Sequence, residues 1–336
     1  MRYFFYSVLF LLFIGCAAVP FKPYKIKGLS LVAAGTAIDS THTKPVINMN
    51  ANAVSIMPYG FIRDKSNPEI IYNTERQWFG ETKAGAKQYI ETLRKDDIEI
   101  MIKPHIWLWH GEFTGFLKMN SETNWKRLEQ SYTNYILDYA KLAEDVNAEV
   151  FCIGTELEEF IKSRPQYWEN LIKEIRSLYS GKLTYAANWD EFWHTPFWSD
   201  LDYIGIDAYF PISDMRTPTV ENCIEGWEKH KQGLKEFSDK LNRPILFTEY
   251  GYRSVDYAGK EPWRYDRSMI SVNHEAQNNT TQALFDTVWH EDWFAGGYLW
   301  KWFIEHHKVG GMDNNQFTPQ NKPVEDIIKN FYKKKL

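Results

Sequence analysis

Cysteine is scarce in this chain, which has three in 336 residues. Cys16 falls in the N-terminal segment. The other two, Cys152 in an apolar strand and Cys223 on a predicted helix, are too few for a disulfide framework. Neither has a histidine or cysteine at metal-ligand spacing, and His306-His307 is interpreted as a loop pair. We therefore expect no structural metal and no cofactor.

Positive charge is also in short supply. The formal net charge is −5, and the one dense basic run, Lys333-Lys334-Lys335, is interpreted as a solvated tail. Because binding to nucleic acid needs a concentrated basic face, we expect no nucleic-acid partner. Internal repeats, low-complexity tracts and linkers are absent too, so we expect one domain and a monomer.

The N-terminus carries an apolar run, Phe4 to Ile14, that is shorter than the roughly 20 residues needed to span a bilayer. Arg2 precedes it, and its end, Leu12-Phe-Ile-Gly-Cys16, resembles the lipobox of bacterial lipoproteins. The resemblance implies a signal peptide over residues 1–15, lipid on Cys16 and a short tether over residues 16–24. The protein would then be anchored in the bacterial cell envelope, at the outer membrane or cell surface. A plain cleaved signal peptide is the alternative.

From residue 25 onward, short apolar runs alternate with longer amphipathic ones. Strands are predicted over residues 26–33, 53–57, 99–107, 149–155, 183–187, 203–209, 245–248 and 297–302. Helices are predicted over residues 83–95, 125–146, 166–179, 222–240, 275–289 and 324–331, whereas 36–50 is poorly helical. This alternation indicates a parallel α/β sheet, and the length suits one (β/α)8 TIM barrel over residues 25–336. A doubly wound open sheet is the alternative, although no G-x-G-x-x-G or P-loop follows the first strand.

Two apolar segments end in Thr-Glu. They are Phe151-Cys-Ile-Gly-Thr-Glu156 and Pro244-Ile-Leu-Phe-Thr-Glu-Tyr250. Because barrel enzymes place reactive groups at the carboxyl ends of their strands, we interpret Glu156 and Glu249 as a catalytic pair. The alternatives are that Glu156 caps the following helix and that Glu249 forms a buried ion pair with Arg253 or Lys103.

Polar and aromatic residues gather near the other predicted strand tips. Residues two apart on a strand point the same way, so each group below shares one face. We predict that these residues bind substrate: Lys103, His105 and Trp107 on the third strand, Asn188 and Trp189 after the fifth, Asp207 and Tyr209 on the sixth, and Trp300 and Trp302 on the eighth. Aromatic rings at a wet site suit the C–H faces of sugars. Loops 109–121, 189–199 and 254–273, the last with Trp263, are expected to shape the cleft.

Glycoside hydrolysis is the chemistry that needs two carboxylates in such a cleft. One acid protonates the leaving oxygen, and the other attacks or stabilises the oxocarbenium-like carbon. Strands four and seven face each other across a barrel mouth, which is compatible with the roughly 5 to 5.5 Å separation of retaining enzymes. We therefore predict retention, with a general acid whose pKa is raised by burial and by its charged neighbour.

The segments Ile153-Gly-Thr-Glu-Leu157, Leu246-Phe-Thr-Glu-Tyr250 and Phe317-Thr-Pro-Gln-Asn-Lys-Pro323 are similar to glycoside hydrolase family 113, within the clan of retaining barrel glycosidases. The resemblance implies activity on β-1,4-mannan, with Glu156 as acid/base and Glu249 as nucleophile. It implies further that Tyr209 hydrogen-bonds the nucleophile and that Trp300 or Trp302 is a sugar-stacking floor. Most of the clan has asparagine where Thr155 stands, so Asn188 is our choice for binding the 2-hydroxyl. The alternatives are a β-glucan or mixed hexosan hydrolase and a surface lipoprotein that binds glycan without cutting it.

Overall fold

The computed structural model describes residues 24–265 and 269–335. The predicted signal peptide, the lipidation site Cys16 and nearly all of the predicted tether lie outside the described residues. Within the ranges that are described, no helix combines the length and the apolar character needed to cross a membrane.

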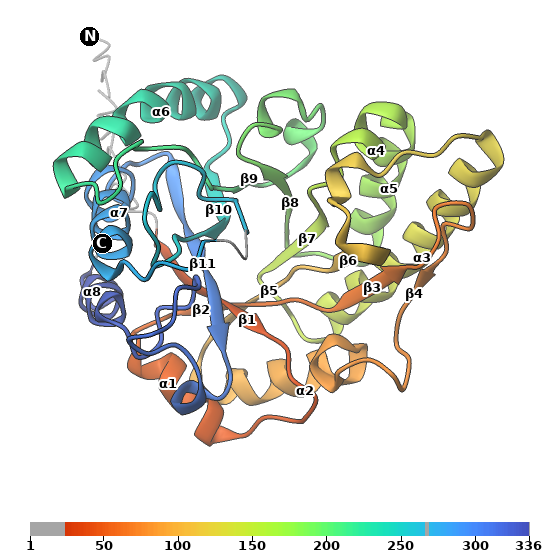
Figure 1. Cartoon of the computed structure of the whole chain (residues 1–336). Helices are drawn as coiled ribbons and strands as arrows, with labels where there is room; N and C mark the ends of the chain where they lie inside the picture. The colour runs from red at the N-terminus through yellow and green to blue at the C-terminus, as the bar shows by residue number, and fades with distance from the viewer. Residues whose placement is uncertain (1–23, 266–268, 336) are drawn as a thin grey trace, which may run out of the picture.

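Eight parallel strands close into a barrel, which confirms the predicted (β/α)8 fold (Figure 1). Around the barrel the order is β1, β2, β5, β7, β8, β9, β10 and β11, and β11 pairs with β1. The strands are Ile26–Val32 (β1), Ala53–Ile56 (β2), Glu99–Ile102 (β5), Val150–Thr155 (β7), Lys182–Asn188 (β8), Ile204–Asp207 (β9), Ile245–Tyr250 (β10) and Phe294–Phe303 (β11). Their carboxyl ends meet at one face, which is the mouth of the barrel.

Helices surround the barrel (Figure 1). The α-helices are Ser40–Asn48 (α1), Lys83–Leu93 (α2), Glu122–Asp145 (α3), Glu158–Ser163 (α4), Pro165–Leu178 (α5), Val220–Leu241 (α6), His274–Thr287 (α7) and Pro323–Tyr332 (α8). Short 3-10 turns lie at Phe79–Glu81 (η1), Arg94–Asp96 (η2), Trp109–Gly111 (η3), Thr114–Phe116 (η4), Phe192–His194 (η5), Trp198–Asp200 (η6) and His306–Lys308 (η7).

Helix α1 occupies part of the segment that the sequence pattern described as poorly helical. Its start is stabilised by a capping box, in which the Asp39 side chain accepts the N–H of Thr41 and the His42 ring accepts the N–H of Asp39. Pro45 lies inside the helix. The cap satisfies N–H groups that the first turn leaves without partners, and so offsets a weak helical propensity.

The predicted third strand, residues 99–107, is broken in two. β5 ends at Ile102, and after Pro104 the chain continues as β6 (His105–Leu108) in a different sheet. Proline has no N–H to donate to a strand ladder, which accounts for the break. The second barrel strand behaves in the same way, because beyond Pro58 it continues as β3 (Tyr59–Ile62).

β3 and β6 pair in parallel, and with β4 (Ile70–Ile71) they form a three-stranded sheet that the sequence pattern did not predict. Along β3 and β6, buried residues alternate with more accessible ones. The accessible phase carries four ring side chains that line hollows at the mouth: Tyr59, Phe61, His105 and Trp107. This small sheet is therefore a side wall of the cleft.

The inside of the barrel changes from apolar to polar along its axis. An apolar cluster fills one end: Ile26, Ala53, Met101, Val150, Cys152, Ala186, Tyr203, Leu246, Ala295 and Tyr298. Nearer the mouth the buried side chains include Lys103, Asp207 and Thr248. A larger apolar cluster lies between the strands and the helices. Cys152 and Cys223 are both buried and free.

Candidate active site

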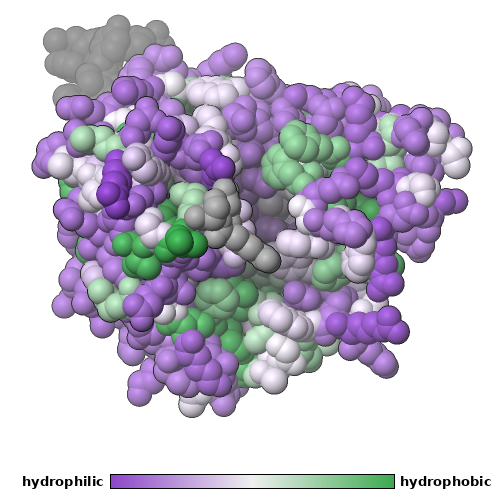
Figure 2. Space-filling view, in the orientation of Figure 1, coloured by the Kyte–Doolittle hydropathy of each residue, from purple (hydrophilic) through white to green (hydrophobic). Residues whose placement is uncertain are grey.

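A hollow opens at the mouth of the barrel and contains both predicted catalytic glutamates. Its lining residues are Tyr59, His105, Ile106, Trp107, Leu108, Gly111, Glu112, Phe113, Thr114, Thr155, Glu156, Glu249 and Trp300. In the space-filling view the molecule is hollowed near the middle of this face, with apolar surface beside the hollow (Figure 2). The tips of β7 and β10 thus bring two carboxyl groups to one opening.

Glu249 accepts two hydrogen bonds, one from a charged donor and one from a hydroxyl. Lys103 donates to its Oε1 at 2.6 Å, and the Tyr209 hydroxyl donates to its Oε2 at 2.7 Å. The residue is 6% exposed and lines the hollow, so its carboxylate is fixed in direction while still reachable from the mouth. The hydrogen bond from Tyr209 to Glu249 is the one that the family resemblance implied. Tyr209 is itself buried.

Lys103 and Asp207 do not face the cleft, which corrects their prediction as substrate-binding residues. Lys103 is 0% and Asp207 1% exposed, and the ammonium lies 3.0 Å from Asp207 Oδ1. Thr248 also donates to that oxygen at 2.7 Å. The break at Pro104 separates Lys103 from His105 and Trp107, the other two in-phase residues of the predicted third strand, so Lys103 points into the barrel axis and the other two belong to the wall.

The pKa values of Lys103 and Asp207 are both raised, but for different reasons. Burial alone would lower the pKa of Lys103, but Asp207 and Glu249 outweigh it and raise that pKa above its ordinary value. Burial, with repulsion from Glu249, raises the pKa of Asp207 to about 7, although Lys103 and Thr248 oppose the rise. Lys103 is therefore the cation that allows two carboxyl groups to share one buried site.

Glu156 follows β7 directly and has a left-handed backbone, with φ of 49°. Such a conformation costs about 1–3 kcal/mol in a residue with a side chain, so it persists only where the surrounding structure holds it. The residue does not cap α4, whose N-cap is Leu157 without a side-chain bond. Burial raises the pKa of Glu156 well above its usual value, and the charges of Asp207 and Glu249 raise it further.

Three other groups in the hollow are polar and close to the glutamates. His105 Nε2 lies 4.0 Å from Glu249 Oε1, and burial together with Lys103 lowers the pKa of this ring well below its usual value. Tyr59, whose ring centroid is 5.2 Å from that of His105, was not predicted. Nor was Thr155 predicted to contact substrate. Among the described residues, His105 Nε2 and Thr155 Oγ1 are buried without a hydrogen-bond partner.

Trp300 and Trp302 are not equivalent, and the prediction that both bind sugar is wrong for the second. Trp300 lines the hollow, whereas Trp302 is 0% exposed and packs in the main core. The register of β11 against β1 explains this, because Leu29 pairs with Leu299 but Leu31 pairs with Trp302. The extra residue is a bulge, and it breaks the two-residue alternation on which the prediction depended.

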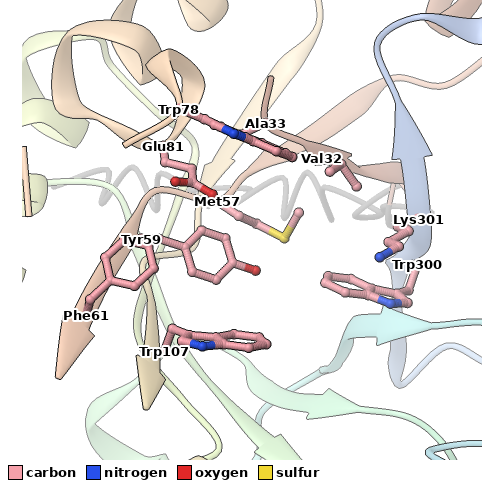
Figure 3. Close-up of a pocket in the computed structure, with 10 residues that line it drawn as sticks. All are labelled: Val32, Ala33, Met57, Tyr59, Phe61, Trp78, Glu81, Trp107, Trp300 and Lys301. Atoms are coloured by element: carbon pink, nitrogen blue, oxygen red, sulfur yellow. The ribbon is translucent and has the colours of Figure 1, made fainter. Parts of the chain in front are cut away.

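A second hollow adjoins the first and shares Tyr59, Trp107 and Trp300 with it. Figure 3 shows Trp78 and Trp107 on opposite sides of this space, with the Tyr59 hydroxyl and the Lys301 ammonium pointing into it. Its lining also includes Val32, Ala33, Met57, Phe61 and Glu81. The two hollows together form a groove along the wall made by β3 and β6.

Asn188 and Trp189 lie beside the hollow without lining it. Asn188 ends β8, and its Oδ1 accepts the N–H of Trp189 at 2.8 Å. Trp189 stacks on Trp263 with ring centroids 5.1 Å apart. The contact between Asn188 and a 2-hydroxyl stays a prediction, because Thr155 lines the hollow and Asn188 does not.

No group of three or more His, Cys, Asp or Glu side chains is arranged to hold a metal ion in residues 24–265 and 269–335. His306 instead contacts the carboxylate of Glu325 at 2.5 Å.

Replacing Lys103 with methionine is expected to destabilise the fold by about 3–5 kcal/mol, because it leaves Asp207 and Glu249 buried without a cation. The loss should shrink as the pH falls below 7, since the raised pKa of Asp207 means that this carboxylate then takes up a proton and the repulsion is removed. Urea unfolding measures both effects. The control is Lys118→Met, which removes an exposed ion pair with Glu159 and should cost about 1 kcal/mol or less. Equal losses in the two variants would contradict the role given to Lys103.

The model of Glycoside Hydrolase Family 113 matches residues 36–322. Among solved structures, the GH113 β-mannanase AaManA from Alicyclobacillus acidocaldarius has 22% identity and a TM-score of 0.77, over 92% of this chain and 97% of its own. A GH113 β-1,4-mannanase has 20% identity and a TM-score of 0.80, over 93% and 100%. A β-glucuronidase from Faecalibacterium prausnitzii has 16% identity and a TM-score of 0.63, over 93% and 49%. No curated protein sequence matches.

Proposed function

The chain belongs to glycoside hydrolase family 113, and from this we propose that it hydrolyses β-1,4-mannan by double displacement with retention of configuration. The observation that carries the proposal is that Glu156 and Glu249 line one hollow, with Glu249 oriented by Lys103 and Tyr209. The names of two similar structures, both β-mannanases, support the choice of mannan.

Glu249 is the proposed nucleophile. Its carboxylate attacks the anomeric carbon, forming a glycosyl ester as the bond to the leaving oxygen breaks. The bonds from Lys103 and Tyr209 hold one oxygen each, so the attacking group does not have to be ordered when substrate arrives. His105, kept neutral by the depressed pKa of its ring, adds no competing positive charge beside the carboxylate.

Glu156 is the proposed acid/base. Because its pKa is raised well above the usual value, the carboxyl stays protonated at a pH where most glutamates are ionised, and it can give its proton to the leaving oxygen. In the second step the resulting carboxylate takes a proton from water, which attacks the glycosyl ester and releases Glu249. Activity should therefore fall as the pH rises through the pKa of Glu156.

The length of the groove favours a polysaccharide substrate over a single sugar. Rings at the junction of the two hollows, from Tyr59, Trp107 and Trp300, offer faces to consecutive units, and Lys301 and Glu81 offer polar groups to hydroxyls of the neighbouring unit. In the first hollow, Thr155 and His105 each carry a buried polar atom, Oγ1 and Nε2, that has no hydrogen-bond partner among the described residues, and we assign these two side chains to hydroxyls of the bound sugar.

A substrate panel tests the proposal. The purified protein without its N-terminal segment is incubated with mannan, glucomannan, xylan and cellulose, and the products are resolved by chain length. We expect manno-oligosaccharides from mannan and glucomannan and no release from xylan or cellulose. Cleavage of β-glucan in preference to mannan would instead favour the hexosan alternative, and binding without release of reducing ends would favour a glycan-binding protein.

Trp107→Ala is expected to raise KM for mannan about ten-fold with little change in kcat, since a stacking contact of about 1–1.5 kcal/mol is lost from both hollows. The side chain is 51% exposed, so its removal should leave stability almost unchanged. Tyr24→Ala serves as the control, because this exposed aromatic residue lies just before β1, at the opposite end of the barrel. A KM equal to that of the parent enzyme would show that the wall does not bind the chain.

A further inference from the structure

A buried carboxylate outside the hollow is linked to Glu156 by hydrogen bonds. Glu191, in the loop after β8, is 3% exposed. Its Oε1 accepts the hydroxyl of Tyr185 at 2.7 Å, and its Oε2 accepts the N–H of Asn188 at 3.0 Å. The Tyr185 oxygen in turn accepts the N–H of Leu157 at 2.6 Å. A continuous chain therefore runs from Glu191 to the peptide immediately after Glu156.

The backbone of Glu156 depends on support of this kind. Its positive φ is rare for a residue with a side chain, and such conformations persist only where the surroundings hold them. Before the bend, the N–H of Glu156 donates to the carbonyl of Ala186 at 2.8 Å. After the bend, the N–H of Leu157 donates to Tyr185. β8 thus fixes the peptide on both sides of the acid.

Tyr185 is itself held rigidly. It is 0% exposed, and its ring packs against those of Trp168, Phe197 and Trp198 with centroids 6.0, 5.7 and 6.1 Å away. The hydroxyl cannot change partner without disturbing this aromatic group, so a change at Glu191 is transmitted to Leu157.

We propose that Glu191 and Tyr185 are positioning residues for Glu156, holding the peptide beyond it so that its carboxyl points at the glycosidic oxygen. Neither lines the catalytic hollow, so their action passes through the backbone. This inference rests on the acid/base role proposed for Glu156. It accounts for a buried carboxylate that the two-glutamate mechanism does not otherwise use.

The charge of Glu191 acts in the same direction. Burial is the largest cause of the raised pKa of Glu156. The charges of Asp207, Glu249 and Glu191 raise this pKa further, and that of Lys103 lowers it. Burial raises the pKa of Glu191 itself to about 7, against the hydrogen bonds from Tyr185 and Asn188, while the charges of Glu158 on α4 and Asp207 on β9 add to the rise. Removing the charge of Glu191 should therefore lower the pKa of Glu156.

The test compares Tyr185→Phe, Glu191→Gln, Glu156→Ala and the parent enzyme on two substrates. One is mannan, and the other is a dinitrophenyl β-mannoside, whose leaving group departs without a proton. Tyr179→Phe is the matched control, because it removes another buried tyrosine hydroxyl that binds a backbone carbonyl, that of Ala148, away from the site. Circular dichroism and melting curves establish that each variant folds.

For Tyr185→Phe we expect kcat on mannan to fall by up to about 100-fold with KM unchanged, because a misdirected acid loses rate and not affinity. Release of dinitrophenolate in the first turnover should change little. Glu191→Gln should move the basic limb of the kcat/KM profile on mannan to lower pH. Tyr179→Phe should do neither.

Equal losses on the two substrates for Tyr185→Phe, or an unmoved basic limb in Glu191→Gln, would overturn the inference. If Tyr185→Phe fails to fold, the pH profile of Glu191→Gln decides alone. Should Glu156→Ala keep full activity on mannan, the acid/base role falls and this inference falls with it. If Glu156→Ala loses mannan activity while Tyr185→Phe and Glu191→Gln match the parent, only the positioning role is lost.

Discussion

Replacing Glu249 with alanine is expected to lower kcat on mannan by about 10⁴-fold or more, since the carboxylate proposed to form the glycosyl intermediate is removed. The barrel should remain folded, because Lys103 keeps its ion pair with Asp207. Azide offers a second readout. In the space left by the carboxylate it can attack the anomeric carbon of a dinitrophenyl β-mannoside, displacing dinitrophenolate and giving the α-mannosyl azide.

The control for this variant is Glu261→Ala, which removes a partly exposed glutamate from the loop that follows β10. It should retain the activity of the parent enzyme. Near-parental hydrolysis by Glu249→Ala, or a β-configured azide product, would remove Glu249 as the nucleophile. In that case the buried ion pair with Lys103 would be its whole role.

Glu156→Ala is expected to lower kcat on mannan roughly 10² to 10⁴-fold, the usual contribution of a general acid. Formation of the glycosyl intermediate from a dinitrophenyl β-mannoside should be spared, because that leaving group needs no proton. The basic limb of the pH profile, which the raised pKa of Glu156 sets in the parent enzyme, should disappear. Added azide should give the β-mannosyl azide, formed by attack on the intermediate.

Glu158→Ala is the matched control, since Glu158 lies two residues further on and pairs with Lys162 at the surface. It tests whether any carboxylate near the tip of β7 matters. Equal losses on mannan and on the aryl mannoside in Glu156→Ala would count against the acid role and favour a structural one.

The fold and the position of the two glutamates could be predicted from local pattern. Strands buried on both faces appear as continuous apolar runs, and in a barrel their carboxyl ends meet whatever the loops do. That rule places Glu156 and Glu249 at the mouth without any knowledge of side-chain contacts. The hydrogen bond from Tyr209 to Glu249 was implied by family resemblance and not by spacing.

The rest of the site depends on features that the alternation of side chains along a strand does not encode. A bulge in β11 buries Trp302, and the break at Pro104 sends Lys103 and His105 in different directions. Two features of the sequence do mark these irregularities. Pro58 and Pro104 each mark the end of a ladder, and Asp39 with His42 marks a helix start. Contacts such as that of Tyr185 with Leu157 join residues 28 positions apart and have no local signature.

The first strand and the last helix of the described residues meet on the side of the barrel remote from the groove. β1 starts at Ile26, at the amino end of its strand, and the Lys27 ammonium contacts the carbonyl of Tyr332 at the end of α8. Whatever precedes residue 24, whether the predicted lipid-bearing tether or a laboratory linker, thus joins the barrel behind the working face. An enzyme immobilised in this way would present its groove outward, toward a polymer too large to reach beneath it.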